Sequence, residues 1–355
     1  MIARAHGSMS PKSTSTRLVL GAAEVAREAV RLVVIGDPPR VERLGALAGL
    51  LRAGDVVVVN DAATLPGALR GTTADGEVIE LRLAGPIDGR RLDGVLLGAG
   101  DYWIRTEHRT APPALVPGAR VQLGPVGATV VTARGRRVTL DADASGDALW
   151  QALYAAGRPV QYAHRPEPLA LWTVQTGYAA RPWAAEMPSA GRGLTWEILL
   201  GLRRAGVGIA RLTHAAGLSS TGDAALDAAL PWPERYDIPA ATTGAIAAAR
   251  ARGGRVVAVG TTVVRALEAS GGLPGPGVAT LRLDARTRPR VVDGLLSGLH
   301  VPGESHFELL TAFAPAARLR AALAVAVAAG LSAHELGDAC LVLDQRDQRA
   351  GAAAR

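Results

Sequence analysis

The stretch Arg255-Val-Val-Ala-Val-Gly-Thr-Thr-Val-Val-Arg-Ala-Leu-Glu268 decides how this chain folds. Residues 255–260 are mostly apolar, include three valines and end in a glycine, which predicts a buried strand. Thr261 and Thr262 are expected to form a tight turn, and residues 263–270 are expected to form a helix. A strand, a turn and a helix in this order make half of a βαβ unit, so the stretch predicts an α/β fold.

The same stretch predicts a site for an anion. Gly260 permits a sharp turn at the end of the strand. The hydroxyls of Thr261 and Thr262 stand beside the first N–H groups of the helix, which have no partner within the helix and bind carboxylates or phosphates. The alternative is that Thr262 only caps the helix, which is a common role for threonine.

Upstream of this stretch, the sequence predicts a second buried strand and a small inserted domain. A short amphipathic helix is expected over residues 44–51, and four valines followed by Asn60 predict a strand over residues 56–60. Between residues 65 and 140, short apolar segments alternate with Gly, Pro or Asp, which is typical of antiparallel strands. Because a barrel closes its own edges, we expect a small β-barrel inserted into a larger α/β domain.

The predicted boundaries follow from these patterns. The larger α/β catalytic domain is expected to be discontinuous and to comprise residues 17–64 and 145–345. The barrel is expected to comprise residues 65–144, and the flexible ends are residues 1–16 and 346–355. The further predicted elements are helices over 147–156, 195–205, 242–252, 306–314 and 318–329, and strands over 280–283 and 339–343. Arg265 and Glu268 are expected to pair on the surface of their helix.

Composition narrows the class of protein. With 355 residues, 48% of them hydrophobic, the chain can bury a sizeable core in two domains, which argues against a disordered protein. The net charge of +7 comes from arginines, because Lys12 is the only lysine. A basic surface suits a polyanion such as tRNA. The alternative is a set of solvated arginines without a partner.

The single cysteine, Cys340, excludes an intramolecular disulfide and a cysteine-cluster metal site. The chain has no apolar signal-peptide region near Met1 and no apolar run of about 18 residues. We therefore expect a cytoplasmic protein that does not enter a membrane.

Residues 259–268, Val-Gly-Thr-Thr-Val-Val-Arg-Ala-Leu-Glu, resemble the signature of the S-adenosylmethionine:tRNA ribosyltransferase-isomerase family of queuosine biosynthesis. Other segments resemble further motifs of that family in the same order, and the resemblance spans about residues 44–343. These segments are Gly54-Asp55, Asn60-Asp61, Gln175-Thr-Gly-Tyr178, Pro188-Ser-Ala-Gly191, Glu234 with Tyr236, His300-Val-Pro302 and Gly337-Asp338-Ala339.

The resemblance implies an enzyme that uses S-adenosylmethionine as a ribosyl donor. The ribosyl group would be transferred to the 7-aminomethyl-7-deazaguanine base of tRNA and isomerised, giving epoxyqueuosine and releasing adenine and methionine. It implies tRNA as the partner and no metal. The catalytic residues it implies are His214, His300 and Glu234. The residues it implies for S-adenosylmethionine are Gly260, Thr261, Thr262, Gln175, Tyr178 and Asp61.

The chain also departs from the family pattern. Gly193 and Trp232 stand where the family has histidines, and Gly298 stands in place of an asparagine. Two other functions therefore stay open: a diverged member that uses S-adenosylmethionine on a small molecule or another base, and a non-catalytic RNA-binding scaffold. Each site residue also has a structural alternative, such as an ion pair of Glu234 with Arg235. The sequence does not indicate the oligomeric state.

Overall fold

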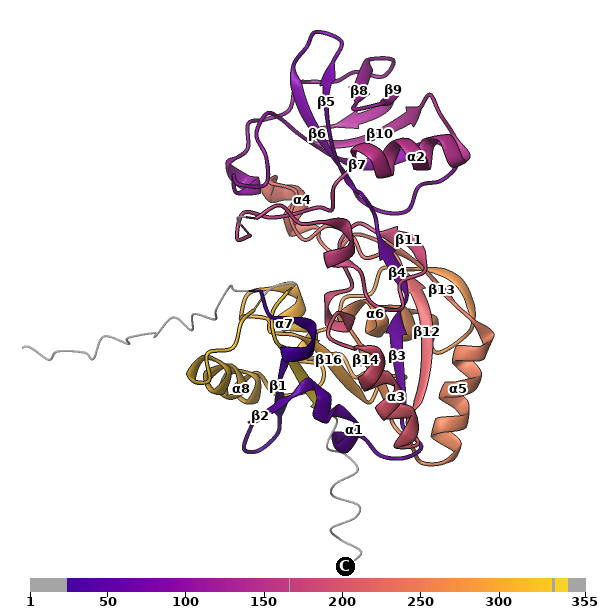
Figure 1. Cartoon of the computed structure of the whole chain (residues 1–355), viewed down its shortest axis with the longest axis vertical. Coiled ribbons are helices and arrows are strands. Elements are labelled where there is room, and N and C mark those ends of the chain that lie inside the picture. Colours follow the sequence, from indigo (N-terminus) through magenta and orange to yellow (C-terminus); the bar gives the residue numbers. More distant parts are fainter. Residues whose placement is uncertain (1–23, 166, 334–335, 344–355) are drawn as a thin grey trace, which may run out of the picture.

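The computed structural model describes residues 24–165, 167–333 and 336–343 and consists of a large α/β core with a smaller barrel beyond one edge of its sheet (Figure 1). The predicted fold class, an α/β domain with an inserted β-barrel, is confirmed. The predicted flexible ends, residues 1–16 and 346–355, lie outside the described residues.

The core contains a nine-stranded mixed sheet with the order β15-β13-β12-β3-β14-β16-β17-β1-β2. Its four central strands, β12, β3, β14 and β16, run parallel. The strands are β1 Arg31–Ile35, β2 Arg40–Arg43, β3 Val56–Asn60, β12 Gly208–His214, β13 Glu234–Ile238, β14 Val256–Val259, β15 Gly275–Ala279, β16 Gly294–Gly298 and β17 Ala339–Leu343. The strands predicted over residues 56–60 and 339–343 are confirmed.

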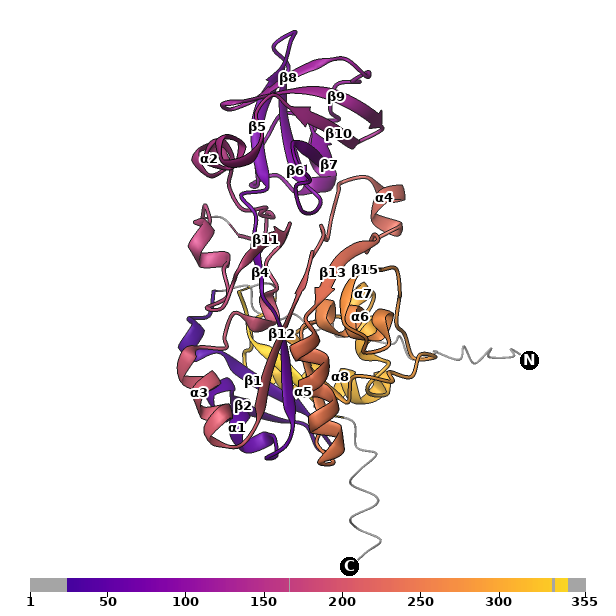
Figure 2. The same cartoon turned by 90° about the vertical axis from the view of Figure 1, so that its right-hand side faces the viewer.

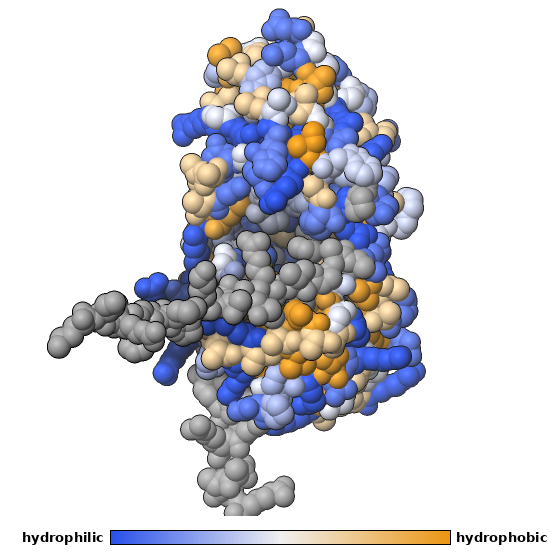
Figure 3. Space-filling view, turned by 90° about the vertical axis from the view of Figure 1, so that its left-hand side faces the viewer, coloured by the Kyte–Doolittle hydropathy of each residue, from blue (hydrophilic) through white to orange (hydrophobic). Residues whose placement is uncertain are grey.

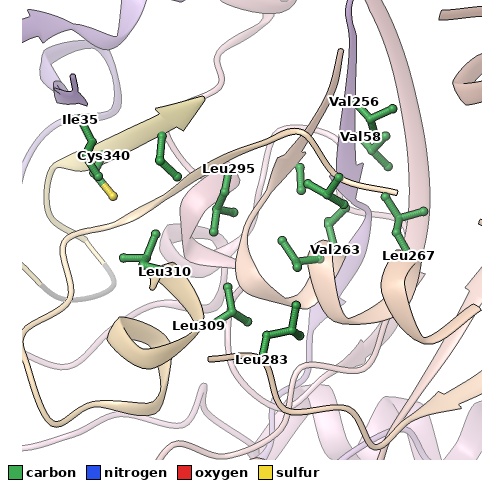
Figure 4. Packing of buried hydrophobic residues seen from close by; sticks show 14 of the residues in the cluster. Ile35, Val58, Val256, Val263, Leu267, Leu283, Leu295, Leu309, Leu310 and Cys340 are labelled. Atoms are coloured by element: carbon green, nitrogen blue, oxygen red, sulfur yellow. The ribbon is translucent and has the colours of Figure 1, made fainter. Parts of the chain in front are cut away.

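Helices cover both faces of this sheet. One face packs against α1 and α3, and the other packs against α5, α6, α7 and α8 around the apolar cluster drawn in Figure 4. These helices are α1 Leu47–Leu50, α3 Trp196–Arg204, α5 Ala240–Ala251, α6 Thr261–Ser270, α7 Ser305–Leu310 and α8 Ala316–Ala328. The 3₁₀ helices are η1 Arg27–Ala29, η2 Leu44–Ala46, η3 Thr106–His108, η4 Leu171–Val174 and η5 Ser189–Gly191. A short helix, α4 Ala224–Ala228, lies on the side of the core that faces the barrel (Figure 2).

Six antiparallel strands form a closed barrel in the order β10-β7-β6-β5-β8-β9. They are β5 Ala68–Thr73, β6 Val78–Leu83, β7 Arg91–Leu97, β8 Arg120–Leu123, β9 Val126–Arg134 and β10 Arg137–Ala142. Helix α2 (Gly146–Ala156) packs Leu149 and Leu153 into the apolar interior of the barrel. This packing supports assigning α2 to the barrel, beyond the boundary expected at residue 144.

Two short pairings lie where the barrel meets the core. Strands β4 (Ala62–Thr64) and β11 (Arg181–Ala184) form a parallel pair between the two units. Where the chain enters and leaves the barrel, Ala68 and Arg158 exchange two backbone hydrogen bonds of 2.8 and 3.0 Å. The entry and exit of the barrel therefore lie side by side.

Three predicted elements differ from the structure. The helix expected over residues 306–314 is shorter, because α7 ends at Leu310. The strand expected over residues 280–283 is instead β15, residues 275–279, whose glycines and proline hide it from the usual strand signals. The glycine at 277 is needed because a Cβ there would lie 2.4 Å from the ring of Tyr236 on the neighbouring strand. Thr261 and Thr262 are the first residues of α6 and do not form a separate turn.

Candidate functional site

The candidate site lies where the parallel strands end. β3, β12, β14 and β16 finish at the same edge of the sheet, at Asn60, His214, Val259 and Gly298. In open α/β sheets, ligands bind beyond the carboxyl ends of the strands, where neighbouring connections leave in opposite directions. The chain leaves β3 toward the barrel and leaves β14 directly into α6, so this edge satisfies that condition (Figure 1).

Asn60 holds three segments of this edge together. Its side-chain amide donates to the carbonyl of His214 at 2.9 Å and to Oγ1 of Thr262 at 3.3 Å. Its Oδ1 accepts the N–H of His214 at 2.9 Å. The side chain is buried and links β3, β12 and α6, so it fixes their spacing at the site. Asn60 is absent from the predicted site residues, although an amide that ends a strand of four valines is a usable signal in the sequence.

The glycine–threonine turn has the geometry of an anion site. Gly260 has a φ of 93°, in the region that favours glycine, and serves as the N-cap of α6 without a side-chain cap. Its own N–H bonds to the carbonyl of Leu296 on β16 at 2.8 Å. In the described structure, the Thr262 hydroxyl accepts from Asn60 and does not cap the helix. The dipole of α6 and its first N–H groups therefore favour a negative group at this turn.

His214 ends β12 with a completely buried imidazole. Its Nε2 lies 3.6 Å from Oε2 of Glu234, and neither ring nitrogen has a hydrogen bond among the described residues. Burial, reinforced by the positive charge of Arg265, lowers the pKa of His214 to about 3. The imidazole is therefore neutral at pH 7, with an available acceptor nitrogen.

Glu234 is buried beside His214 and forms an ion pair with Arg265. It also accepts the N–H of Gly217 at 2.6 Å. Burial raises the pKa of Glu234, and the charge of Arg265 opposes that rise. The alternative prediction, an ion pair of Glu234 with Arg235, is wrong, because the partner is Arg265. The guanidinium of Arg235 lies over the ring of Trp183.

The predicted pairing of Arg265 with Glu268 is wrong, because Arg265 forms its ion pair with Glu234. The guanidinium points into the core, where it also bonds to the carbonyls of Ala279 at 3.1 Å and Leu281 at 3.2 Å. Glu268 accepts three backbone N–H groups of the segment 290–292. The expected pairing assumed a solvent-exposed helix face, whereas Arg265 is only 5% exposed.

His300 lies after β16, in surroundings different from those of His214. Its Nε2 is 3.0 Å from Oγ of Ser297, and its Nδ1 is 3.6 Å from a carboxylate oxygen of Glu304. Its ring stacks on that of His306, with centroids 4.8 Å apart. Within the described residues, no hydrogen bond or ion pair joins His300 to His214, so the two predicted catalytic histidines belong to separate clusters.

Three of the predicted S-adenosylmethionine residues are already engaged with the protein. Asp61 accepts the hydroxyl of Thr213 at 2.6 Å, on the opposite face of the sheet from the Glu234 cluster. The Gln175 side chain bonds to both the N–H and the carbonyl of Thr64, each at 2.9 Å. Burial raises the pKa of Tyr178, and the charge of Asp61 adds to the rise, so its hydroxyl stays protonated.

The positions that depart from the family pattern have distinct surroundings. A Cβ at Gly193 would lie 2.6 Å from a methyl carbon of Leu44, so a larger side chain there requires Leu44 to move. Gly193 and Gly298 line one cavity of about 20 Å³, which is room for a single water. Trp232 lies away from this cavity, with the guanidinium of Arg137 from the barrel 4.7 Å above its ring.

Among the described residues, no three His, Cys, Asp or Glu side chains are grouped so that they could hold a metal ion. No helix in residues 24–165, 167–333 or 336–343 has both the length and the apolar character needed to cross a bilayer.

Comparison with known proteins identifies the family. The family model described as "Queuosine biosynthesis protein" matches residues 16–342. A protein of Anaeromyxobacter dehalogenans named S-adenosylmethionine:tRNA ribosyltransferase-isomerase is 35% identical, with 92% of this chain and 96% of that protein covered. A protein of Acidithiobacillus ferrooxidans with the same name is also 35% identical, with 85% and 87% covered.

A solved structure of S-adenosylmethionine tRNA ribosyltransferase from Thermotoga maritima is 22% identical, covers 91% of this chain and 96% of its own, and has a TM-score of 0.49. The family assignment rests on the sequence matches alone. They agree with the resemblance of residues 259–268 and of the other motifs. The chain belongs to the queuosine biosynthesis protein family, which includes S-adenosylmethionine:tRNA ribosyltransferase-isomerases.

Proposed function

We propose that this protein transfers and isomerises the ribosyl group of S-adenosylmethionine onto the 7-aminomethyl-7-deazaguanine base of a tRNA. The products are epoxyqueuosine in the tRNA, adenine and methionine, and the reaction takes place in the cytoplasm without a metal. One observation carries the proposal beyond family membership: His214, whose neutral imidazole has no hydrogen bond among the described residues, is joined through its backbone and Asn60 to Thr262 in the turn that opens α6.

The turn is suited to hold the amino-acid end of S-adenosylmethionine. Its carboxylate would bind the first N–H groups of α6 and the hydroxyls of Thr261 and Thr262. This arrangement needs Gly260, because a sharp bend with a φ of 93° disfavours other residues. The ribose would then lie toward the ends of β12 and β16.

The chemistry requires a base near the ribose. A sulfonium acidifies the hydrogens at C5′, and removal of one of them lets adenine leave. The aminomethyl nitrogen is then alkylated, and methionine departs as the ring contracts. His214 is the proposed base, because its imidazole is neutral at pH 7. A general base works best when its pKa is near the working pH, so the role requires the low pKa of the buried imidazole to rise when substrate binds. Since its side chain is fully buried, this role requires the surrounding loop to open when substrate binds.

The other predicted residues receive supporting roles in the proposal. The Glu234 carboxylate, 3.6 Å from His214, would stabilise the imidazolium that forms when the base accepts a proton. His300, which is 20% exposed, would hydrogen-bond the ribose or the incoming amine. Gln175, Tyr178 and Asp61 would shape the pocket walls through the contacts that already hold them.

The direct test incubates the purified protein with S-adenosylmethionine and tRNA bearing the aminomethyl base. Release of adenine and methionine with modification of the tRNA would support the proposal. Calorimetry with S-adenosylmethionine separates the alternatives. Binding without reaction on tRNA would favour a diverged member with another acceptor, and no binding at millimolar concentration would favour a non-catalytic scaffold.

The Thr262→Val variant tests the turn itself. Loss of a hydrogen bond to a charged group weakens binding by about 1.5–3 kcal/mol, so calorimetry should show a correspondingly lower affinity for S-adenosylmethionine. Thr243→Val, in the first turn of α5, is the matched control and should bind like the wild type. Unchanged affinity of Thr262→Val would mean that the turn has only a structural role.

A further inference from the structure

The hairpin between β9 and β10 concentrates positive charge. Its sequence is Arg134-Gly135-Arg136-Arg137, with Gly135 at a φ of 57° and Arg134 directly opposite Arg137 in the strand register. Three guanidinium groups thus extend from four consecutive residues. Like charges on facing strand positions destabilise a hairpin unless an opposite charge balances them.

The described structure provides no such balance within the protein. Other arginines of the barrel are paired with carboxylates: Arg70 with Asp101 at 3.2 Å, and Arg120 with Asp143 at 2.5 Å. Among the described residues, no ion pair is formed by any of the three hairpin arginines, and the NH1 nitrogen of Arg136 is buried without a hydrogen-bond partner. A buried donor without a partner is costly, so no hydrogen bond of this nitrogen within the described protein holds the Arg136 side chain away from an external ligand.

The hairpin also lies next to the candidate site. The Arg137 guanidinium stands 4.7 Å above the ring of Trp232, in the loop that follows α4 on the barrel-facing side of the core (Figure 2). The carbonyl of Trp232 accepts a hydrogen bond from Arg265 at 3.3 Å. Two residues further on is Glu234, the ion-pair partner of Arg265 and neighbour of His214. The hairpin arginines therefore contact, through Arg137 and Trp232, the loop that leads to Glu234 in the candidate site.

We propose that the hairpin of residues 134–137 binds phosphate groups of the tRNA backbone beside the target base. Guanidinium groups bind phosphate with paired hydrogen bonds, and each contact releases counterions. Backbone contacts of this kind position a nucleic acid without reading its sequence. The inference rests on the proposed function and adds where the tRNA lies: its backbone crosses from the barrel hairpin to the loop of Trp232, so that the base reaches the sheet edge.

The test is tRNA binding by the Arg134→Ser/Arg136→Ser double variant. Arg137 is left in place because its stacking on Trp232 holds the loop of the core. The matched control is Arg43→Ser/Arg320→Ser, which removes the same charge from exposed positions on β2 and α8, at the end of the core away from the barrel (Figure 1). Dissociation constants for tRNA are measured by fluorescence anisotropy at several salt concentrations, and thermal melting verifies that both variants are folded.

We expect the hairpin variant to bind tRNA about tenfold more weakly at low salt, with a slope of log K against log salt reduced by about one to two. The control should stay within about twofold of the wild type. Unchanged affinity and slope in the hairpin variant would overturn the inference. Equal weakening in the control would also overturn it, because net charge alone would then explain the effect.

Calorimetry with S-adenosylmethionine on the same proteins separates this inference from the proposed function. The hairpin variant should bind S-adenosylmethionine like the wild type, because its changes lie in the barrel. If the wild type binds neither S-adenosylmethionine nor tRNA, the proposed function fails and takes the inference with it. If the wild type binds both and the hairpin variant matches it in tRNA affinity, only the inference fails.

Discussion

The buried trio of Arg265, Glu234 and His214 carries charge in a region where charge is costly. Removing ions from water costs several kcal/mol each, and only close pairing with further hydrogen bonds offsets that cost. Glu234 receives the guanidinium and one backbone N–H, while Arg265 bonds to three carbonyls. His214 contributes no charge at pH 7, so the trio holds one positive and one negative group.

Breaking this ion pair is expected to be strongly destabilising. Arg265→Met leaves Glu234 buried without a counter-charge, which costs about 3–5 kcal/mol of unfolding free energy. The double variant Arg265→Met/Glu234→Gln removes both charges and should recover part of that loss. Urea denaturation measures all three free energies of unfolding. A single variant as stable as the wild type would contradict the proposed energetics.

Acid stability should depend on His214. Its pKa falls from 6.5 in the unfolded chain to about 3 in the folded protein, so the unfolded state binds more protons between these values. The histidine's contribution to stability is therefore complete above pH 6.5 and is lost as the pH falls toward 3, by up to about 1.4 kcal/mol per pH unit. His214→Gln cannot titrate and should have a shallower dependence of unfolding free energy on pH from 6.5 to 4. His300→Gln controls for loss of an imidazole, and equal slopes for His214→Gln and the wild type would refute the expectation.

For individual residues, the sequence indicated which side chains could take part in catalysis or binding better than it indicated their hydrogen-bond and ion-pair partners. The residue types at positions 214, 234 and 260–262 were recognisable, and 214, 234 and 262 meet at one edge of the sheet. The ion pair of Arg265 with Glu234 was not recognisable. The rule that charged residues three apart on a helix pair with each other applies to exposed helix faces, and the sequence does not indicate that Arg265 is buried. Likewise, the bridging role of Asn60 depends on contacts with residues more than 150 positions away.

Among the elements, the strands that close the barrel depend on one tight approach. β5 pairs with β8 through only two residue pairs, and a Cβ at Gly71 would lie 2.0 Å from the carbonyl oxygen of Gln122. That carbonyl belongs to the backbone of the neighbouring strand and cannot turn aside like a flexible side chain. The glycine therefore permits the last seam of the barrel to form.

Substituting alanine for glycine should have opposite effects in two elements. Gly71→Ala forces β5 and β8 apart and is expected to cost about 1–3 kcal/mol. Gly244→Ala lies inside α5, where an added Cβ meets no atom within 4 Å, and should stabilise the protein by about 0.5–1 kcal/mol. Thermal unfolding of both variants measures the effects. A neutral Gly71→Ala would show that the seam adjusts without strain.

The elements best predicted from the sequence were those with uniform patterns. The valine strand at 56–60 and the apolar strand at 339–343 were found with their correct ends. The start of β15 was placed five residues too late because its sequence, Gly-Pro-Gly-Val-Ala, contains three breakers and relies on pairing with β13 for its extended shape. Pairing between distant strands leaves no local signal.

Across the whole molecule, the barrel and the core share a small apolar contact. Val95 and Leu97 of β7 pack with Val160, Ala185 and Leu218 of the core side. Next to this cluster, the hydroxyl of Tyr162 donates to Glu186, and it accepts the N–H of Ser220 at 3.2 Å. The sequence predicted an inserted barrel from its turn punctuation. It could not predict how the barrel sits, because these contacts join segments that have no common pattern.

The Tyr162 hydroxyl should stabilise this junction. Tyr162→Phe removes its hydrogen bonds and is expected to cost about 1 kcal/mol. Hydrogen exchange should become faster around residues 158–165 and 216–221, with the barrel strands unchanged. Tyr154→Phe, on the exposed side of α2, is the control and should exchange like the wild type. Uniform protection in Tyr162→Phe would show that the apolar cluster alone holds the junction.

The paired backbone at Ala68 and Arg158 has a consequence for how such proteins diversify. Because the chain enters and leaves the barrel at one hydrogen-bonded point, the segment between them is a cassette whose ends are already joined. A cassette from a relative could be transplanted there without altering the strand order beneath it. Recombination at these two positions would give the family new outer surfaces on an unchanged reaction centre.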